Sequence, residues 1–117
     1  MDMPPESLLL RIFIGETARH EHHPLYEAIV LKARETHLAG ATVHRCVMGY
    51  GKSSRLHTTK ILDLSEDLPI VIEIVDSEEK INAFLPILDG MMPAGLATLE
   101  KVKTICYRGV SPEAPKA

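Results

Sequence analysis

The side chains best suited to binding chemistry gather in one short stretch of the chain, Met48 to Lys60, which reads MGYGKSSRLHTTK. Its glycines permit a backbone that approaches a ligand closely, and its lysine, arginine and hydroxyl groups could neutralise and hydrogen-bond an anion. The stretch predicts a binding site for a phosphorylated small molecule, with these candidate residues: Gly49, Tyr50, Gly51, Lys52, Ser54, Arg55 and His57.

The alternative for this stretch is a long exposed loop whose polar residues only keep it in water. Arg55 would then pair with Asp63 or Glu66 instead of a ligand. The stretch contains no Walker motif, and Gly49 and Gly51 lack the third glycine and the following helix of a dinucleotide fingerprint. An enzyme that uses His57 as acid or base is a further alternative, although no partner for His57 can be named.

Three other groups of residues could carry chemistry. His20, His22 and His23 form a histidine-rich tract that could share a metal ion with further ligands, or could be a solvated loop. His44 and Cys46 lie on one side of a predicted strand, but a small core cysteine is the simpler interpretation. Glu73 interrupts an apolar run, where pairing with Arg11 or Arg45 across a sheet would explain its charge.

Composition limits the classes of partner and compartment. The chain has 117 residues, a formal net charge of −3, 4% aromatic residues and no Trp, so nucleic acid is not an expected partner. No apolar run approaches the length of a membrane helix, and the acidic, proline-containing start is unlike a signal peptide. With two cysteines and no CxxC motif, the expected location is a reducing cytoplasm.

The elements that would position these residues follow from periodicity. Strands are predicted at residues 7–15, 41–50, 69–76 and 96–107, the last with a bulge, and a short additional strand at 61–64. One helix should begin at Pro24 and end at Gly40. A second should be capped by Asp76 with Glu79 and should kink or end early at Pro86.

This order predicts an α+β, ferredoxin-like βαββαβ domain with a four-stranded antiparallel sheet and a long loop after strand two, Gly49 to Leu68. We expect residues 1–6 to be disordered, 7–107 to form the domain and 108–117 to be a flexible tail. Two helices cover one face of such a sheet, whereas strands one and three are apolar on both faces, so we expect a homo-oligomer to cover the other. Strands two and four should lie on opposite edges, which would leave Cys46 and Cys106 as free thiols.

Several motifs together resemble a family of PII-like proteins catalogued as a domain of unknown function, number one-ninety. They begin with Ile14-Gly15-Glu16, the helix start at Pro24 to Val30, and Ala39-Gly40-Ala41-Thr42-Val43. They continue with Met48 to Gly51, Ser54 to His57, and the run from Leu64 to Asp76. The resemblance covers roughly residues 7 to 107.

The resemblance implies a homotrimer that binds an adenine nucleotide (AMP, ADP or ATP, with Mg²⁺ as a possible companion) at subunit interfaces. It further implies a regulator, not an enzyme, that presents its long loop to a protein partner such as a membrane transporter or channel. The lysine-bearing phosphate loop of PII proteins is replaced here by Gly90 to Gly95, which contains no cation. Phosphate neutralisation is therefore expected from Lys52, Arg55, Lys101 and Lys103. A divalent-cation-binding trimer that uses His20, His22 and His23 is the alternative.

Overall fold

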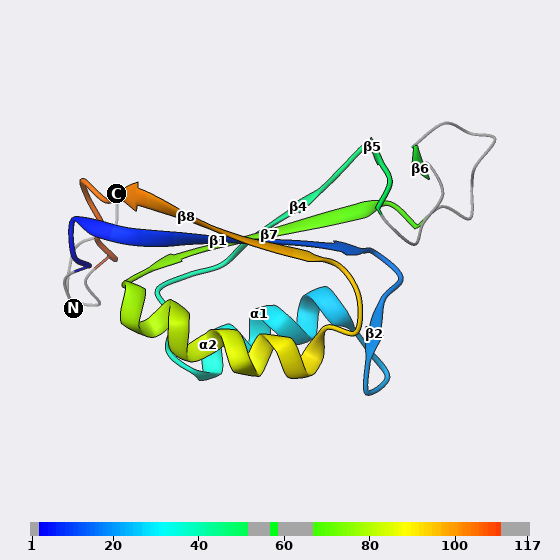
Figure 1. Cartoon of the computed structure of the whole chain (residues 1–117), viewed down its shortest axis with the longest axis horizontal. Coiled ribbons are helices and arrows are strands. Elements are labelled where there is room, and N and C mark those ends of the chain that lie inside the picture. The colour runs from blue at the N-terminus through cyan, green and yellow to red at the C-terminus, as the bar shows by residue number, and fades with distance from the viewer. Residues whose placement is uncertain (1–2, 52–56, 59–66, 111–117) are drawn as a thin grey trace.

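The computed structural model describes residues 3–51, 57–58 and 67–110. Its centre is a four-stranded antiparallel sheet with the spatial order β4-β7-β1-β8 (Figure 1). The strands span Thr42–Arg45 (β4), Pro69–Asp76 (β7), Glu6–Gly15 (β1) and Leu96–Lys103 (β8). Two helices, α1 at Leu25–Glu35 and α2 at Glu78–Met91, complete the predicted ferredoxin-like order.

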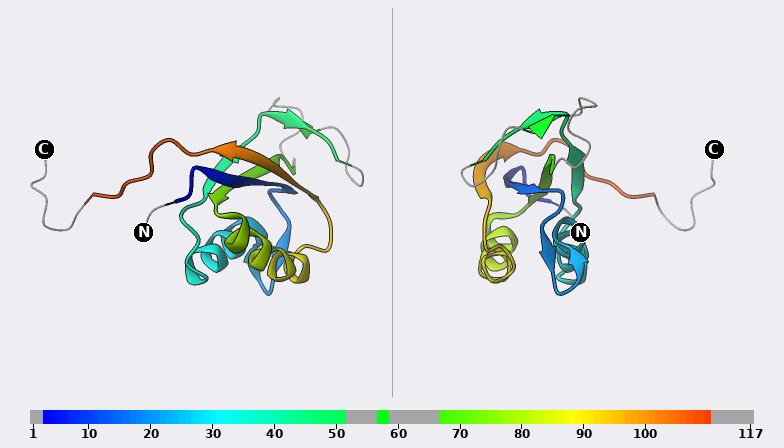
Figure 2. Two further views of the ribbon diagram at one scale, coloured as in Figure 1. Left: turned by 60° about the vertical axis from the view of Figure 1, so that its left-hand side comes forward. Right: turned by 90° about the vertical axis from the view of Figure 1, so that its right-hand side faces the viewer.

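Both helices pack on one face of the sheet and leave the other face open (Figure 2). The core lies between helices and sheet, and its strand residues alternate along the two central strands: Leu8, Leu10, Ile12 and Ile14 from β1, and Ile70, Ile72 and Ile74 from β7. The helices add Leu25, Ile29, Ala33, Ile81, Phe84, Leu88 and Met91. This two-layer arrangement exposes the odd-numbered residues of β1 and β7 on the open face.

No helix among the described residues is long and apolar enough to cross a membrane.

Helix α1 ends earlier than predicted. Its last residue is Glu35 and its C-cap is Thr36, whose hydroxyl lies 2.9 Å from the Lys32 carbonyl. The left-handed turn that follows is made by His37, with φ of 66°, and not by Gly40. The prediction of an end at Gly40 was wrong because a histidine adopted a conformation for which glycine is the usual signal.

Helix α2 also differs from its prediction. Ser77 is the N-cap, and its hydroxyl accepts the Lys80 N–H at 3.2 Å, while Asp76 is the last residue of β7 and is fully buried. The helix does not end early at Pro86 but continues to Met91. The prediction of Asp76 as the cap was wrong by one position.

Two short ribbons extend the domain beyond the predicted elements. The first pairs Arg19–His20 (β2) with His23–Pro24 (β3) and contains the histidine tract, where no strand was predicted. The second pairs Met48–Gly49 (β5) with His57–Thr58 (β6), so the predicted strand at 41–50 is split in two. The short strand predicted at 61–64 lies outside the described residues.

The two edge strands place the two cysteines on opposite sides of the sheet. β4 and β8 occupy opposite edges of the sheet, as expected, and Cys46 and Cys106 follow them as free thiols. β8 pairs with β1 in continuous register from Leu96 to Lys103 and contains no bulge, and it ends four residues before the predicted boundary. Residues 104–107 therefore leave the sheet.

Candidate functional site

A row of polar and charged side chains crosses the open face of the sheet. In register, Glu73 of β7 lies opposite Arg11 of β1 and Thr42 of β4. The Arg11 Nε donates to Glu73 Oε2 at 2.9 Å, and the His44 Nε2 lies 2.8 Å from Glu73 Oε1. Arg11 also lies 3.8 Å from Glu100 of β8. We call these four residues, His44, Glu73, Arg11 and Glu100, the charge ladder.

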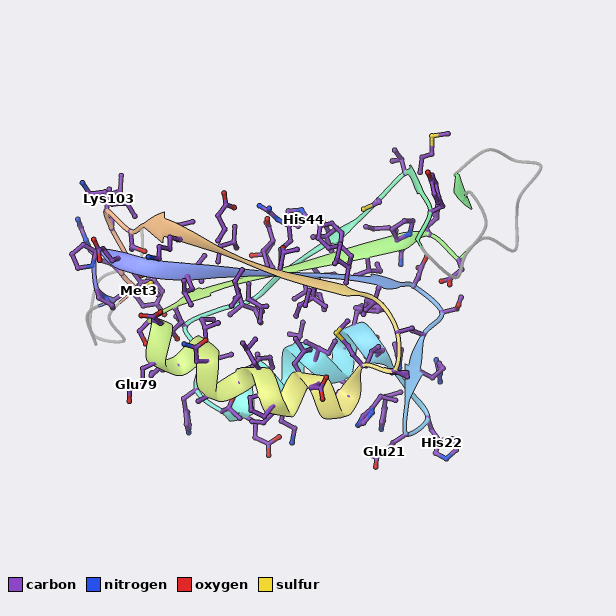
Figure 3. All side chains as sticks on the ribbon, viewed as in Figure 1. Met3, Glu21, His22, His44, Glu79 and Lys103 are labelled. Atoms are coloured by element: carbon purple, nitrogen blue, oxygen red, sulfur yellow. The ribbon has the colours of Figure 1, made fainter. Side chains whose placement is uncertain are left out.

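The charge ladder holds Glu73 in its ionised form. Hydrogen bonds from Arg11, and after them from His44, lower the pKa of Glu73 below its ordinary value of 4.5. The predicted pairing of Glu73 with Arg11 is confirmed, whereas Arg45 instead pairs with Glu16. Figure 3 shows His44 on the side of the sheet away from the helices.

Beside the charge ladder lies an open cavity of about 550 Å³. Its floor consists of apolar side chains of the two central strands, Leu9 and Val75, with Glu73 at one border. Its walls are the connection before β4, residues 39–42, and the segment after β8, with Thr104, Cys106 and Tyr107, together with Met3. Apolar surface with a few polar groups at its border is typical of a small-molecule site.

The wall at residues 39–42 is held in place by Asp76. This carboxylate accepts the Ala39 N–H at 2.8 Å and the Ser77 N–H at 2.7 Å, and it is fully buried at the end of β7. Two charge-assisted bonds satisfy the carboxylate and tie the connection to the core. The position of the wall is therefore fixed by the fold itself.

The predicted loop site begins at the other end of the sheet. Gly49 lies in β5 against Pro69, where an added Cβ would come 2.8 Å from the proline ring, and Tyr50 and Gly51 follow it. The backbone of His57 lies in β6, opposite Gly49. Lys52, Ser54 and Arg55 lie outside the described residues, as do Asp63 and Glu66.

The lysines predicted to assist this loop are far from it within one chain. Lys103 lies opposite Glu6 and Lys101 opposite Leu8, at the end of β1 where the chain enters the sheet. Gly15, at the other end of β1, lies opposite Pro69 and so marks the loop end. Nine residues of strand span roughly 30 Å, so one chain does not bring both groups together (Figure 1).

The histidine tract forms the tip of the β2–β3 ribbon. His20 lies opposite His23, while Glu21 and His22 make the turn with φ of 48° and 74° and are labelled in Figure 3. Within the described ranges, no three His, Cys, Asp or Glu side chains are placed to hold one metal ion.

The cavity was missed by sequence reasoning. Its wall contains Ala39-Gly40-Ala41-Thr42, a motif that the sequence did offer, yet none of these residues is charged, so nothing in their chemistry singled them out. Tyr107 was assigned to the last strand, although it contributes to the cavity from outside the sheet. A signal that could have found the site is the small-residue run that directly precedes an edge strand.

Comparison with known proteins gives a family and a fold. The family model described as DUF190, Uncharacterized ACR, COG1993, matches residues 7–104. A UPF0166 protein of Aquifex aeolicus (strain VF5) is 44% identical over 97 residues, covering 83% of this chain and 91% of the relative. A UPF0166 protein of Methanocaldococcus jannaschii is 36% identical over 78 residues, with coverage of 67% and 71%.

Solved structures with the same fold include a protein from Thermus thermophilus described as PII-like and signaling. It has a TM-score of 0.62 at 21% identity, covering 90% of this chain and 94% of that one. CPII from Thiomonas intermedia K12, bound to ADP and bicarbonate, has a TM-score of 0.57 at 16% identity, with coverage of 85% and 88%. These similarities show that the chain has the ferredoxin-like fold of PII-like proteins, as the sequence predicted.

Proposed function

The chain belongs to the DUF190 family, and we propose that it is a PII-like regulatory protein that binds an adenine nucleotide at the interfaces of a homotrimer. The open-face cavity is the observation that carries this proposal, because it offers an open, mostly apolar hollow on a fold for which ADP-bound examples are known. We place the protein in the cytoplasm and assign it a signalling role without catalysis.

The cavity suits the base and ribose of a nucleotide. Its volume of about 550 Å³ is within the usual range of small-molecule sites. Leu9 and Val75 offer apolar surface to a flat ring, and Tyr107 adds an aromatic side chain. Thr42 and the backbone of residues 40–42 supply the few hydrogen-bonding groups that orient a base.

The phosphates need charge that the cavity lining does not supply. Among the described residues that line the cavity, the only ionised side chain is Glu73, which is acidic. Lys101 and Lys103 lie on β8 at the same end of the sheet, but Lys101 lies opposite Leu8, whose side chain faces the helices. The loop with Lys52 and Arg55 starts at the opposite end of the sheet. A loop from a neighbouring subunit is therefore the source of the remaining cations, and the site is shared between chains.

A shared site would couple ligand binding to signalling. Phosphates bind the ordered form of the Gly49 to Leu68 loop more tightly than other forms, so occupancy shifts the population of loop conformations. A partner protein, such as a membrane transporter or channel, would then meet a different surface in each state. Mg²⁺ would assist where two or more phosphates are bound.

Calorimetric titration with AMP, ADP and ATP, with and without Mg²⁺, tests the proposal. Binding of at least one nucleotide is expected, with Arg55→Ala weakening it several-fold or more through loss of a charge-assisted contact. Arg34→Ala is the matched control, because Arg34 is exposed on α1 away from the sheet. If no heat of binding is measured with any of the three nucleotides, nucleotide binding is refuted. If Arg55→Ala and Arg34→Ala bind with equal affinity, Arg55 does not bind the phosphates.

A further inference from the structure

The segment after β8 is fixed at its start. The Thr104 N–H donates to the Pro5 carbonyl at 2.7 Å. The Thr104 hydroxyl lies 3.2 Å from that of Ser7, which itself donates to the Pro4 carbonyl at 2.8 Å. These contacts anchor Thr104 beside the first residues of β1, at the end of the sheet where the cavity lies.

The segment then reaches across the sheet to the opposite wall. The Tyr107 hydroxyl donates to the Ala39 carbonyl at 2.8 Å. Ala39 belongs to the connection that leads into β4, and β4 and β8 are the two edges of the sheet. Residues 104–107 therefore span the central strands, and Thr104, Cys106 and Tyr107 line the cavity above Leu9 and Val75.

The connection at Ala39 and the segment after β8 differ in how firmly each is held to the domain. Ala39 is fixed through its N–H to the buried carboxylate of Asp76. Among the described residues 105–110, by contrast, the only hydrogen bond is the one from the Tyr107 hydroxyl. Within one chain, Ile105 is 90% exposed and Tyr107 45% exposed, so burial against the chain's own residues adds little to hold the segment down.

We propose that residues 104–107 form a strap that closes the cavity over its ligand, and that the Tyr107–Ala39 hydrogen bond is the latch. A segment anchored at one end and held by one bond at the other opens when that bond breaks. A ligand beneath the strap contacts Tyr107 and favours the closed state. The nature of the ligand rests on the proposed function, whereas the latch is a property of the chain alone.

The latch can be tested without any ligand. Trypsin cleaves after Arg108, next to the latch. A protease binds several residues on each side of the bond that it cleaves, so cleavage after Arg108 needs Tyr107 to leave Ala39. Tyr107→Phe removes only the hydroxyl, and loss of one hydrogen bond should speed the appearance of the fragment that ends at Arg108 by about two- to tenfold. Tyr26→Phe is the control, because Tyr26 lies on α1, does not line the cavity and is not among the candidate binding residues. Equal rates in wild type and Tyr107→Phe would overturn the latch.

The lid function needs ADP as the probe. In wild type, saturating ADP should slow cleavage after Arg108, and in Tyr107→Phe the dissociation rate of ADP should rise by about two- to tenfold with little change in the association rate. If ADP binds but neither effect occurs, the strap is not a lid. If ADP does not bind, the proposed nucleotide fails, while the ligand-free cleavage rates still decide the latch.

Discussion

At the scale of single residues, Glu73 is the centre of the open face. Each of its carboxylate oxygens has its own partner, Arg11 at 2.9 Å and His44 at 2.8 Å, and its side chain is 29% exposed. Glu73→Gln keeps the shape and removes the charge. Because the site is partly open to water, we expect the free energy of unfolding at neutral pH to fall by only about 1 kcal/mol. Denaturant unfolding followed by circular dichroism measures the change.

The same variant has a defined pH dependence. The two bonds lower the pKa of Glu73 below 4.5 in the folded state, so its contribution to stability is complete above that value and is lost as the pH falls through the lowered pKa. The difference in stability between wild type and Glu73→Gln should therefore be constant above pH 4.5 and should narrow as the pH falls below 4.5 through the lowered pKa. Glu27→Gln is the control, because Glu27 is exposed on α1 and makes no ion pair among the described residues. A difference that also stays constant below pH 4.5 would contradict the ion pairs.

At the scale of elements, the β2–β3 ribbon turns through two residues in the left-handed region. Glu21 has φ of 48° and His22 has φ of 74°, and neither is glycine. A left-handed conformation costs an ordinary L-residue roughly 1–2 kcal/mol, and hairpins of this type favour glycine at the second position. His22→Gly should therefore raise the free energy of unfolding by about 0.5–1 kcal/mol.

Its control lies in the adjacent residue. His23 belongs to β3, where glycine has no conformational advantage and loses more backbone entropy on folding, so His23→Gly should lower the stability by about 0.5–1 kcal/mol. Thermal unfolding of the two variants and of wild type shows whether each substitution raises or lowers the stability. If His22→Gly were also destabilising, the turn would not be strained, and the histidine side chain would be holding it in place.

Elements also show how far the sequence could predict this protein. Alternating apolar residues in β1 and β7 set the central strands and their buried face, and the helical period located α1 and α2. The early end of α1 could not be predicted, because His37 makes the turn that Gly40 was expected to make. The length of β8 was overestimated for a related reason: residues 104–107 are as apolar as a strand, yet Tyr107 binds the carbonyl of a distant connection.

In the candidate site, too, some features could be predicted from the sequence and others could not. Pairing of Arg11 with Glu73 was predicted because a charge in an apolar run needs a partner on the neighbouring strand. The cavity was not predicted, since its wall at residues 39–42 is defined by where the backbone runs and by Asp76, not by residues with chemistry of their own. The residues whose chemistry did predict a binding site belong to the loop after Met48, which begins at the other end of the sheet.

At the scale of the whole molecule, the open face remains the surface that one chain cannot cover. Apolar side chains flank the charge ladder on both sides, with Leu9 and Val75 toward the cavity and Phe13, Val71 and Leu96 toward the loop. Helices cover only the opposite face (Figure 2). An apolar sheet face of this extent is best covered by other copies of the chain in closed symmetry, and light scattering should give the mass of a trimer.

Leu96→Glu tests that assembly. Leu96 lies on edge strand β8 opposite Phe13 and is 55% exposed, so a charge there should leave the fold of one chain intact. In a trimer that buries the open face, the same charge would be taken out of water without a partner, which costs several kcal/mol, and the mass should fall to that of a monomer. Leu31→Glu, at a position 62% exposed on α1, should keep the trimer mass. A Leu96→Glu protein with native circular dichroism and an unchanged trimer mass would show that subunits meet elsewhere, and a nucleotide site shared across the open face would lose its structural basis.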